Sequence, residues 1–78
     1  MKPIFVRHHA IDRARQRWNL TGTDEEIASQ LETILEQAKQ ITTSRGALEF
    51  ETGNKRLRCA NAKDRLEIIT VYVRGEYT

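Results

Sequence analysis

The segment Arg7–Arg17, RHHAIDRARQR, places two histidines and four arginines within eleven residues. These residue types can act on phosphate, because guanidinium groups are permanently charged and match phosphate oxygens, and an imidazole can carry a proton near neutral pH. On a helix, His9, Arg13 and Arg17 stand at i, i+4 and i+8 and share one ridge. Like charges at this spacing destabilise a helix by about 0.2–0.5 kcal/mol per pair. The ridge therefore indicates a surface that faces phosphate or the protein's own carboxylates.

A metal site is the competing chemistry for the two histidines. His8 and Asp12 stand at i and i+4 and could supply two ligands, but His8 and His9 point about 100° apart around a helix. The sequence holds no third histidine and a single cysteine, Cys59. A structural zinc site usually needs four ligands of the Cys or His type. We therefore expect no metal and no other cofactor.

Apolar residues indicate the element that carries the ridge. Ile11, Ala14 and Trp18 stand at i, i+3 and i+7, which is the spacing of one helix face. They predict a helix over residues 8–18 whose apolar face packs and whose opposite face carries the charges. The β-compatible residues 3–6 before it predict a short opening strand, with the proline tolerable at its start.

A second helix is predicted to follow the turn at residues 19–22. Thr23 followed by Glu26 is the pattern of a capping box, and acidic residues in the first turn suit the positive end of the helix dipole. The apolar stripe that continues from there has a helical period and consists of Ile27, Leu31, Ile34, Leu35 and Ala38.

Three strands are predicted in the second half of the chain, over residues 47–52, 55–60 and 65–74. Gly53–Asn54 supplies a hairpin turn between the first two. Alternation directs Leu57 and Cys59 toward the core. It directs Arg56 and Arg58 to the opposite face of the sheet, across from the Glu49 and Glu51 side of the partner strand. The expected fold is α+β, with a short N-terminal strand and two helices packed on a three- to four-stranded antiparallel sheet.

Length and composition narrow the class of protein. Seventy-eight residues, 38% apolar and 31% charged, predict one globular domain over residues 1–78. One cysteine, no secretory signal pattern and no apolar run of about 18 residues predict a cytoplasmic location and no membrane contact. A monomer is expected, or a homodimer that covers an open sheet edge. Basic residues concentrate in 1–18 and 53–65 and acidic residues in 23–38, a segregation that suits a nucleic-acid partner.

One family resemblance rests on the helix motif and the last strand. Read as His9-Ala10-x-x-Arg13-x-x-x-Arg17, followed by an acidic helix and a strand with Thr70-Val71-Tyr72, the chain resembles the small RelE-like and BrnT-like proteins of bacteria and phages. It resembles more closely a related family of unknown function in which a His-Ala helix precedes a three-stranded sheet. The spacer at residues 19–22 differs from the short Arg-Gly-Ile-type junction of that family.

The resemblance implies both a fold and an activity. RelE-like toxins are similar in fold to small microbial ribonucleases, cut RNA with basic and aromatic side chains and no metal, and often have a tight-binding antitoxin protein. By this resemblance His9 and Arg13 from the helix motif and Tyr72 from the closing strand are the candidate catalytic residues. The candidate nucleic-acid-binding residues are Arg7, Arg17, Arg56 and Arg58.

The chemistry of metal-free RNA cleavage fits these residue types. The 2′-hydroxyl attacks the neighbouring phosphate, which requires a base, an acid and cations for the developing charge. His9 is the candidate proton carrier, because imidazole has an unperturbed pKa of about 6.5. The second proton carrier is Tyr72 or Glu67, and the arginines stabilise charge.

Two other classes of protein have the same sequence features. One is a non-catalytic module of the same fold, from a phage or mobile element, that binds nucleic acid or a protein. The other is a structural or regulatory protein whose arginines are paired internally. Both RNA hypotheses expect the arginine surface to have few carboxylate neighbours.

Overall fold

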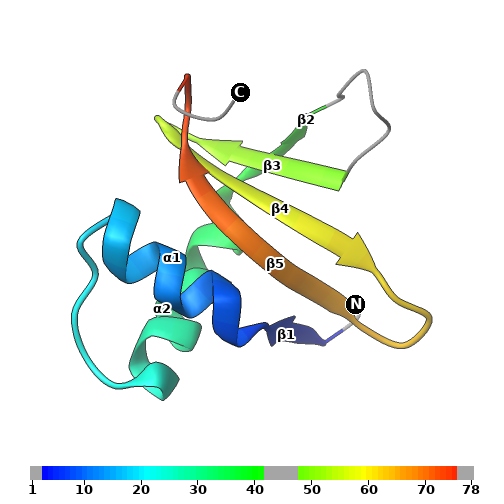
Figure 1. The fold of residues 1–78 in the computed structure, drawn as a ribbon. Helices are drawn as coiled ribbons and strands as arrows, with labels where there is room; N and C mark the ends of the chain where they lie inside the picture. The colour runs from blue at the N-terminus through cyan, green and yellow to red at the C-terminus, as the bar shows by residue number, and fades with distance from the viewer. Residues whose placement is uncertain (1–2, 42–47, 76–78) are drawn as a thin grey trace.

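Two helices and five strands make up residues 3–41 and 48–75, the part of the chain that this computed structural model describes. In chain order they are β1 (Ile4–Val6), α1 (His8–Arg17), α2 (Asp24–Gln37), β2 (Lys39–Ile41), β3 (Leu48–Thr52), β4 (Lys55–Asn61) and β5 (Leu66–Val73) (Figure 1). The class is α+β, as predicted from the sequence. Ala47, which was expected to begin the strand before the hairpin, lies outside the described residues.

The sheet has five strands in the order β1-β5-β4-β3-β2. The sequence predicted a sheet of only three to four antiparallel strands. The observed sheet is larger, and it is mixed, because β1 pairs parallel with β5. The additional strand, β2, directly follows α2 and pairs antiparallel with β3. Its sequence, Lys-Gln-Ile, is too short and too polar to show an alternating pattern. The parallel pairing depends on the path of the chain through both helices, which no local pattern records.

The capping box at the start of α2 is formed as predicted. The Glu26 backbone N–H donates to Thr23 Oγ1 at 3.2 Å, and the Thr23 backbone N–H donates to Glu26 Oε1 at 2.8 Å. These bonds satisfy two backbone donors that a helix start leaves without partners. The helix then buries Ile27, Leu31 and Leu35.

The core lies between the two helices and one face of the sheet. Its buried members are Ala10, Ile11, Ala14, Ile27, Leu31, Leu35, Leu57, Cys59, Ile68 and Val71. Trp18 is half-buried against this cluster, and Leu57 and Cys59 face it as the alternation predicted. Burial raises the pKa of the Cys59 thiol to about 12. No helix within residues 3–41 and 48–75 is long and apolar enough to cross a membrane.

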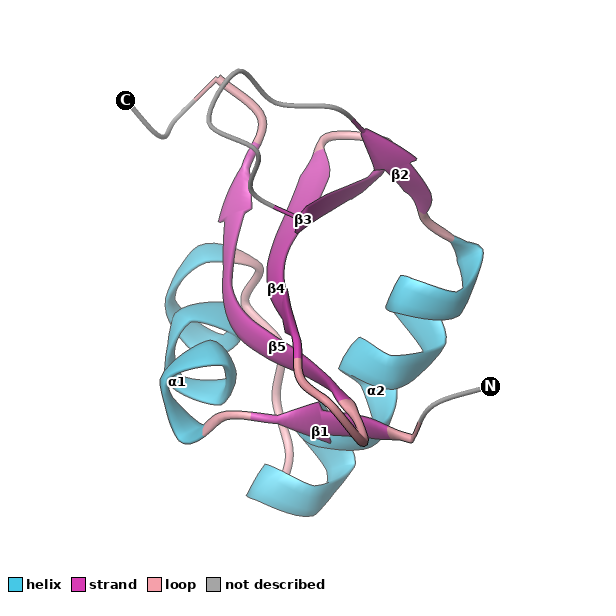
Figure 2. Cartoon of the chain, turned by 90° about the vertical axis from the view of Figure 1, so that its right-hand side faces the viewer, coloured by secondary structure: helices cyan, strands magenta, loops and turns pink. Residues whose placement is uncertain are grey.

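A β-bulge in β5 decides which side chains face the core. Arg58 pairs with Thr70 and Cys59 pairs with Ile68, so that Ile69 is an extra residue with no partner in β4. The extra residue shifts the two-residue alternation, and Ile68 and Val71 both reach the core although they are three positions apart. A bulge also bends its strand, and β5 is drawn as a curved strand that passes both helices (Figures 1 and 2).

The sheet face opposite this core is the polar face. It carries Glu49, Glu51, Arg56, Arg58, Glu67, Thr70 and Tyr72. The predicted placement of Arg56 and Arg58 away from the core is confirmed, and direct pairing with Arg56 places Tyr72 on the same side.

Candidate functional site

The centre of the polar face is a row of residues from three neighbouring strands. Strand register sets Glu49 beside Arg58, and it sets Arg56 between Glu51 and Tyr72. Side chains at such cross-strand positions are direct neighbours on one face. The sheet therefore brings together Tyr72, Arg56 and Arg58, which the sequence predicted as site residues, and adds two glutamates.

Glu49 is the most buried charged group of this row. It is 3% exposed, and Tyr72 is 4% exposed. The Tyr72 hydroxyl donates a hydrogen bond to Glu49 Oε1, and Arg58 Nη2 lies 2.9 Å from Glu49 Oε2. Burial alone would raise the pKa of Glu49, but the bonds from Tyr72 and Arg58 outweigh it and lower this pKa. The carboxylate is thus ionised at neutral pH.

The same contact changes the acidity of Tyr72. Burial is the largest cause of its raised pKa, and the hydrogen bond to the Glu49 carboxylate raises the pKa further. Tyr72 is consequently a protonated hydrogen-bond donor at neutral pH, with its hydroxyl proton directed at Glu49. It is a weak acid in this position.

Glu51 forms a second group at the end of the row, with two arginines. Arg56 Nε lies 2.8 Å from Glu51 Oε1, and Arg74 Nη1 lies 3.7 Å from Glu51 Oε2. The hydrogen bond to Glu51 raises the pKa of Arg56. The Arg56 guanidinium is therefore charged at every physiological pH.

Glu67 organises a third group where β1 meets β5. Arg7 Nε lies 2.7 Å from Glu67 Oε1, and Arg65 Nε lies 2.8 Å from Glu67 Oε2. These two hydrogen bonds, with Arg7 the larger cause, lower the pKa of Glu67. The carboxylate is therefore ionised at neutral pH, so of the two roles open to the second proton carrier named from the sequence, it suits the proton acceptor and not the proton donor.

The expectation that the arginines have few carboxylate neighbours is wrong for Arg7, Arg56 and Arg58. Cross-strand register places a glutamate next to Arg56 and next to Arg58. The parallel pairing of β1 with β5 brings Arg7, which directly follows β1, within reach of Glu67. Arginines nevertheless outnumber glutamates in these groups. Among the described residues, five arginines share three glutamates, which leaves two positive charges in excess: Arg7, Arg56, Arg58, Arg65 and Arg74 against Glu49, Glu51 and Glu67.

The predicted ridge on α1 lies next to this surface. His9 is exposed, and Arg13 Nε lies 3.4 Å from His9 Nε2. Arg13 Nη1 also donates to Gln16 Oε1 at 2.8 Å, and it forms no ion pair with a carboxylate in the described part of the chain. Arg17 Nη1 donates to the backbone oxygen of Val71 at 3.1 Å. The ridge thus runs from an exposed imidazole to the backbone of β5.

His8 points to a different neighbourhood, as its position on the helix predicted. Its Nδ1 lies 3.3 Å from Asp12 Oδ2, and its Nε2 lies 3.5 Å from Asp24 Oδ2. Arg15 Nη2 lies 2.8 Å from Asp24 Oδ1, and this hydrogen bond lowers the pKa of Asp24. The group joins the start of α1 to the start of α2. Across residues 3–41 and 48–75, no group of three or more His, Cys, Asp or Glu side chains is placed to hold a metal.

A cleft of about 500 Å³ lies on the other face of the sheet, beside the C-terminal end of α2. Its lining is largely apolar and includes Ile4, Leu35, Leu48, Phe50 and Leu66. Glu36 is the titratable residue in that lining. The cleft therefore lacks the groups for acid–base chemistry that the polar face and the ridge provide.

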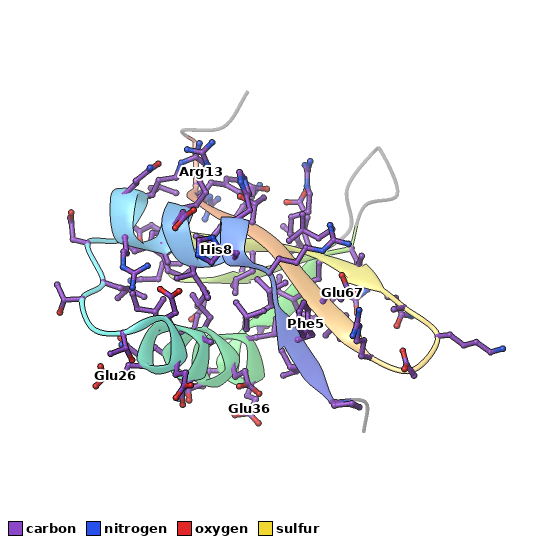
Figure 3. All side chains as sticks on the ribbon, turned by 60° about the horizontal axis from the view of Figure 1, so that its bottom comes forward. Phe5, His8, Arg13, Glu26, Glu36 and Glu67 are labelled. Atoms are coloured by element: carbon purple, nitrogen blue, oxygen red, sulfur yellow. The ribbon has the colours of Figure 1, made fainter. Side chains whose placement is uncertain are left out.

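Charge is divided between two sides of the molecule. α2 carries acidic residues in its first turn and no basic residue in its last turn. Figure 3 shows Arg13 on one side of the molecule and Glu26 and Glu36, both on α2, on the opposite side. The basic ridge therefore faces away from the acidic helix, and the acidic helix is not its partner.

Comparison with protein-family models, with curated proteins and with solved structures gives no match for this chain. The site is therefore defined by its geometry. Sequence reasoning set Arg56 and Arg58 across from Glu49 and Glu51 of the partner strand, and the observed register agrees, but it did not count these glutamates as part of the site. The hairpin turn at Gly53–Asn54 was the signal for them, because a two-residue turn fixes the register of the strands that it joins.

Proposed function

We propose that this protein binds RNA through its polar face and the α1 ridge, and that it cleaves RNA without a metal, as a toxin ribonuclease of the RelE-like type. The observation that carries the proposal is the excess of arginines over the glutamates that hold them. Additional cations would add little to the stability of the fold, because ion pairs on a protein surface contribute little to the free energy of folding. Their presence therefore favours a role in binding.

Arginines that are held by carboxylates are suited to phosphate. Arg7, Arg56 and Arg65 each direct Nε at a glutamate. A guanidinium has five N–H donors in a rigid plane, and its terminal nitrogens can bind phosphate oxygens while Nε stays on the carboxylate. Holding the side chain in place reduces the rotamer entropy that is lost when the ligand binds.

In the proposed reaction the 2′-oxygen loses its proton and attacks phosphorus, the bond from phosphorus to the 5′-oxygen breaks, and the 5′-oxygen takes up a proton. The products are a 2′,3′-cyclic phosphate and a 5′-hydroxyl. His9 is the proton carrier and Arg13, at 3.4 Å, stabilises charge on the phosphate. Tyr72, as a weak acid bonded to Glu49, is the second proton carrier in this scheme. Because Tyr72 is a weak acid, the proposed cleavage step depends most on His9.

The test is incubation of the purified protein with RNA in a metal chelator. His9→Ala and Arg13→Ala are expected to cut at least about 100-fold more slowly, which is the scale of a lost acid–base group. Arg15→Ala is the matched control, because Arg15 lies on the same helix and contacts Asp24. Circular dichroism checks that each variant is folded. No cleavage by the parent protein, or equal cleavage by the His9 variant, refutes the ribonuclease.

A non-catalytic RNA-binding module is the second candidate. The burial of both Glu49 and Tyr72 favours it, because neither group reaches substrate without movement of the side chains above it. This candidate predicts that RNA is bound with steep salt dependence and recovered intact. An antitoxin partner remains a proposal, which growth arrest on expression, relieved by a neighbouring gene product, would support.

A further inference from the structure

Phe5 is the large hydrophobic side chain that the described residues leave exposed, with 46% of its surface accessible. It lies on β1, directly beside Glu67 of β5 in the parallel pairing. Figure 3 shows the two side chains together at the junction of these strands. Two residues further along the chain, Arg7 extends to the same glutamate.

The groups around Phe5 form a compact arrangement of one aromatic ring and two cations. The guanidinium carbon of Arg65 lies 4.6 Å from the centroid of the Phe5 ring. Arg7 and Arg65 both bond through Nε to the Glu67 carboxylate. The Arg7 and Arg65 side chains are 51% and 44% exposed, whereas the Glu67 side chain is 9% exposed. A nearly buried anion thus holds two exposed cations, one of which, Arg65, lies over the exposed Phe5 ring.

This arrangement has the components of a single-stranded nucleic-acid contact. Bases in single strands stack on aromatic rings and on arginine planes, and the cations beside them bind the backbone. The group carries one positive charge in excess, because two arginines share Glu67. In the described part of the chain, Arg7 and Arg65 direct only Nε toward a carboxylate, which leaves their terminal nitrogens for phosphate.

We propose that Phe5, Arg7 and Arg65 are an anchor for single-stranded RNA, in which the two arginines bind one phosphate and an adjacent base stacks on the Phe5–Arg65 pair. This inference rests on the proposed function and specifies it: the substrate is a single strand, held at the β1–β5 edge. Glu67 positions both arginines and does not contact the RNA.

The anchor is tested by fluorescence anisotropy with a labelled RNA of about ten nucleotides, within the site sizes typical of such surfaces. All proteins carry His9→Ala, so that the probe stays intact. Phe5→Leu is expected to weaken binding about tenfold, and Phe5→Tyr to retain it. Arg7→Gln and Arg65→Gln are each expected to weaken binding and to reduce the salt slope by about one. Arg15→Gln, with the same loss of charge elsewhere, is expected to leave both unchanged.

A second probe separates stacking from charge. With an RNA of the same length that lacks its bases, Phe5→Leu is expected to bind like its parent, while the arginine variants still bind more weakly. A duplex RNA is expected to show no effect of Phe5→Leu, because its bases are not available for stacking.

Two results overturn the anchor while RNA binding itself persists. One is unchanged single-strand affinity in the folded Phe5→Leu variant. The other is an equal loss of affinity for Arg65→Gln and Arg15→Gln. Absence of RNA binding by the parent protein is a separate outcome, which overturns the proposed function and the anchor together.

Discussion

Replacement of Tyr72 by phenylalanine tests the central contact of the polar face. The change removes one oxygen and keeps the ring, so that packing around β5 is preserved. It deletes the hydrogen bond from the Tyr72 hydroxyl to the Glu49 carboxylate, in a place where both residues are at most 4% exposed. A hydrogen bond to a charged group contributes about 1.5–3 kcal/mol. We therefore expect a loss of about 2 kcal/mol in the free energy of unfolding.

The measurement is urea unfolding at pH 7, followed by the fluorescence of Trp18, the single tryptophan. The urea midpoint is expected to fall with an unchanged m-value, because the surface exposed on unfolding is the same. For a chain of this size the melting temperature should fall by about 8–16 °C. Thr33→Val is the matched control, since it removes a hydroxyl from an exposed helix position and should change stability by less than about 0.5 kcal/mol.

A double-mutant cycle tests whether Glu49 is the partner of the Tyr72 hydroxyl. Glu49→Gln removes the charge that both Tyr72 and Arg58 face, and because Arg58 keeps 25% exposure, water replaces part of that interaction. We expect the Tyr72 and Glu49 substitutions to be coupled by about 1–2 kcal/mol. Strictly additive effects, or a Tyr72→Phe protein as stable as the Thr33→Val control, would show that the hydroxyl makes no stabilising bond to Glu49.

Three further predictions concern stability and reactivity. The pKa values of Glu49 and Glu67 are lowered in the fold below their usual 4.5, so the stability they confer is complete above about pH 4.5 and is lost as the pH falls through the lowered values. Urea midpoints should therefore be similar at pH 7 and pH 5 and lower at pH 3.5, and an unchanged midpoint at pH 3.5 contradicts this. Thr23→Ala should destabilise the protein by about 1 kcal/mol through loss of the capping box, whereas equal stability in thermal melts would show that the box contributes nothing. Cys59, with its thiol pKa raised to about 12, should resist alkylation at pH 8 in the native protein and react on unfolding, as mass spectrometry will show.

Local patterns in the sequence predicted the helices, the hairpin and the class of fold. Thr23 and Glu26 act within one helical turn, and Gly53–Asn54 acts within one hairpin, so each depends only on neighbouring residues. The strand β2 and the parallel pairing of β1 with β5 were not predicted, because both join segments that are distant in the chain. The parallel pair in particular brings Phe5 to Glu67 across sixty-two positions of sequence.

The candidate site residues stay a prediction, but their placement can be compared with the fold. Arg56 and Arg58 were chosen for their charge and Tyr72 from the family resemblance, and strand register makes them neighbours on one face. The hairpin turn indicates that Glu49 lies opposite Arg58, but no spacing reveals that Glu49 is buried and accepts a hydrogen bond from Tyr72. The side chains that face a given arginine are set by register and by burial, which are properties of the folded sheet.

The bulge at Ile69 makes the length of β5 as important as its composition. Deletion of this one residue would restore the simple alternation and turn one half of the strand over, so that either Val71 or Ile68 would leave the interior and a polar neighbour would enter it. Substitutions at Ile69 that keep the residue count should be tolerated far better than its removal. Homologous chains that share this architecture should therefore accept changes of residue type between Glu67 and Tyr72 but neither lengthen nor shorten that segment.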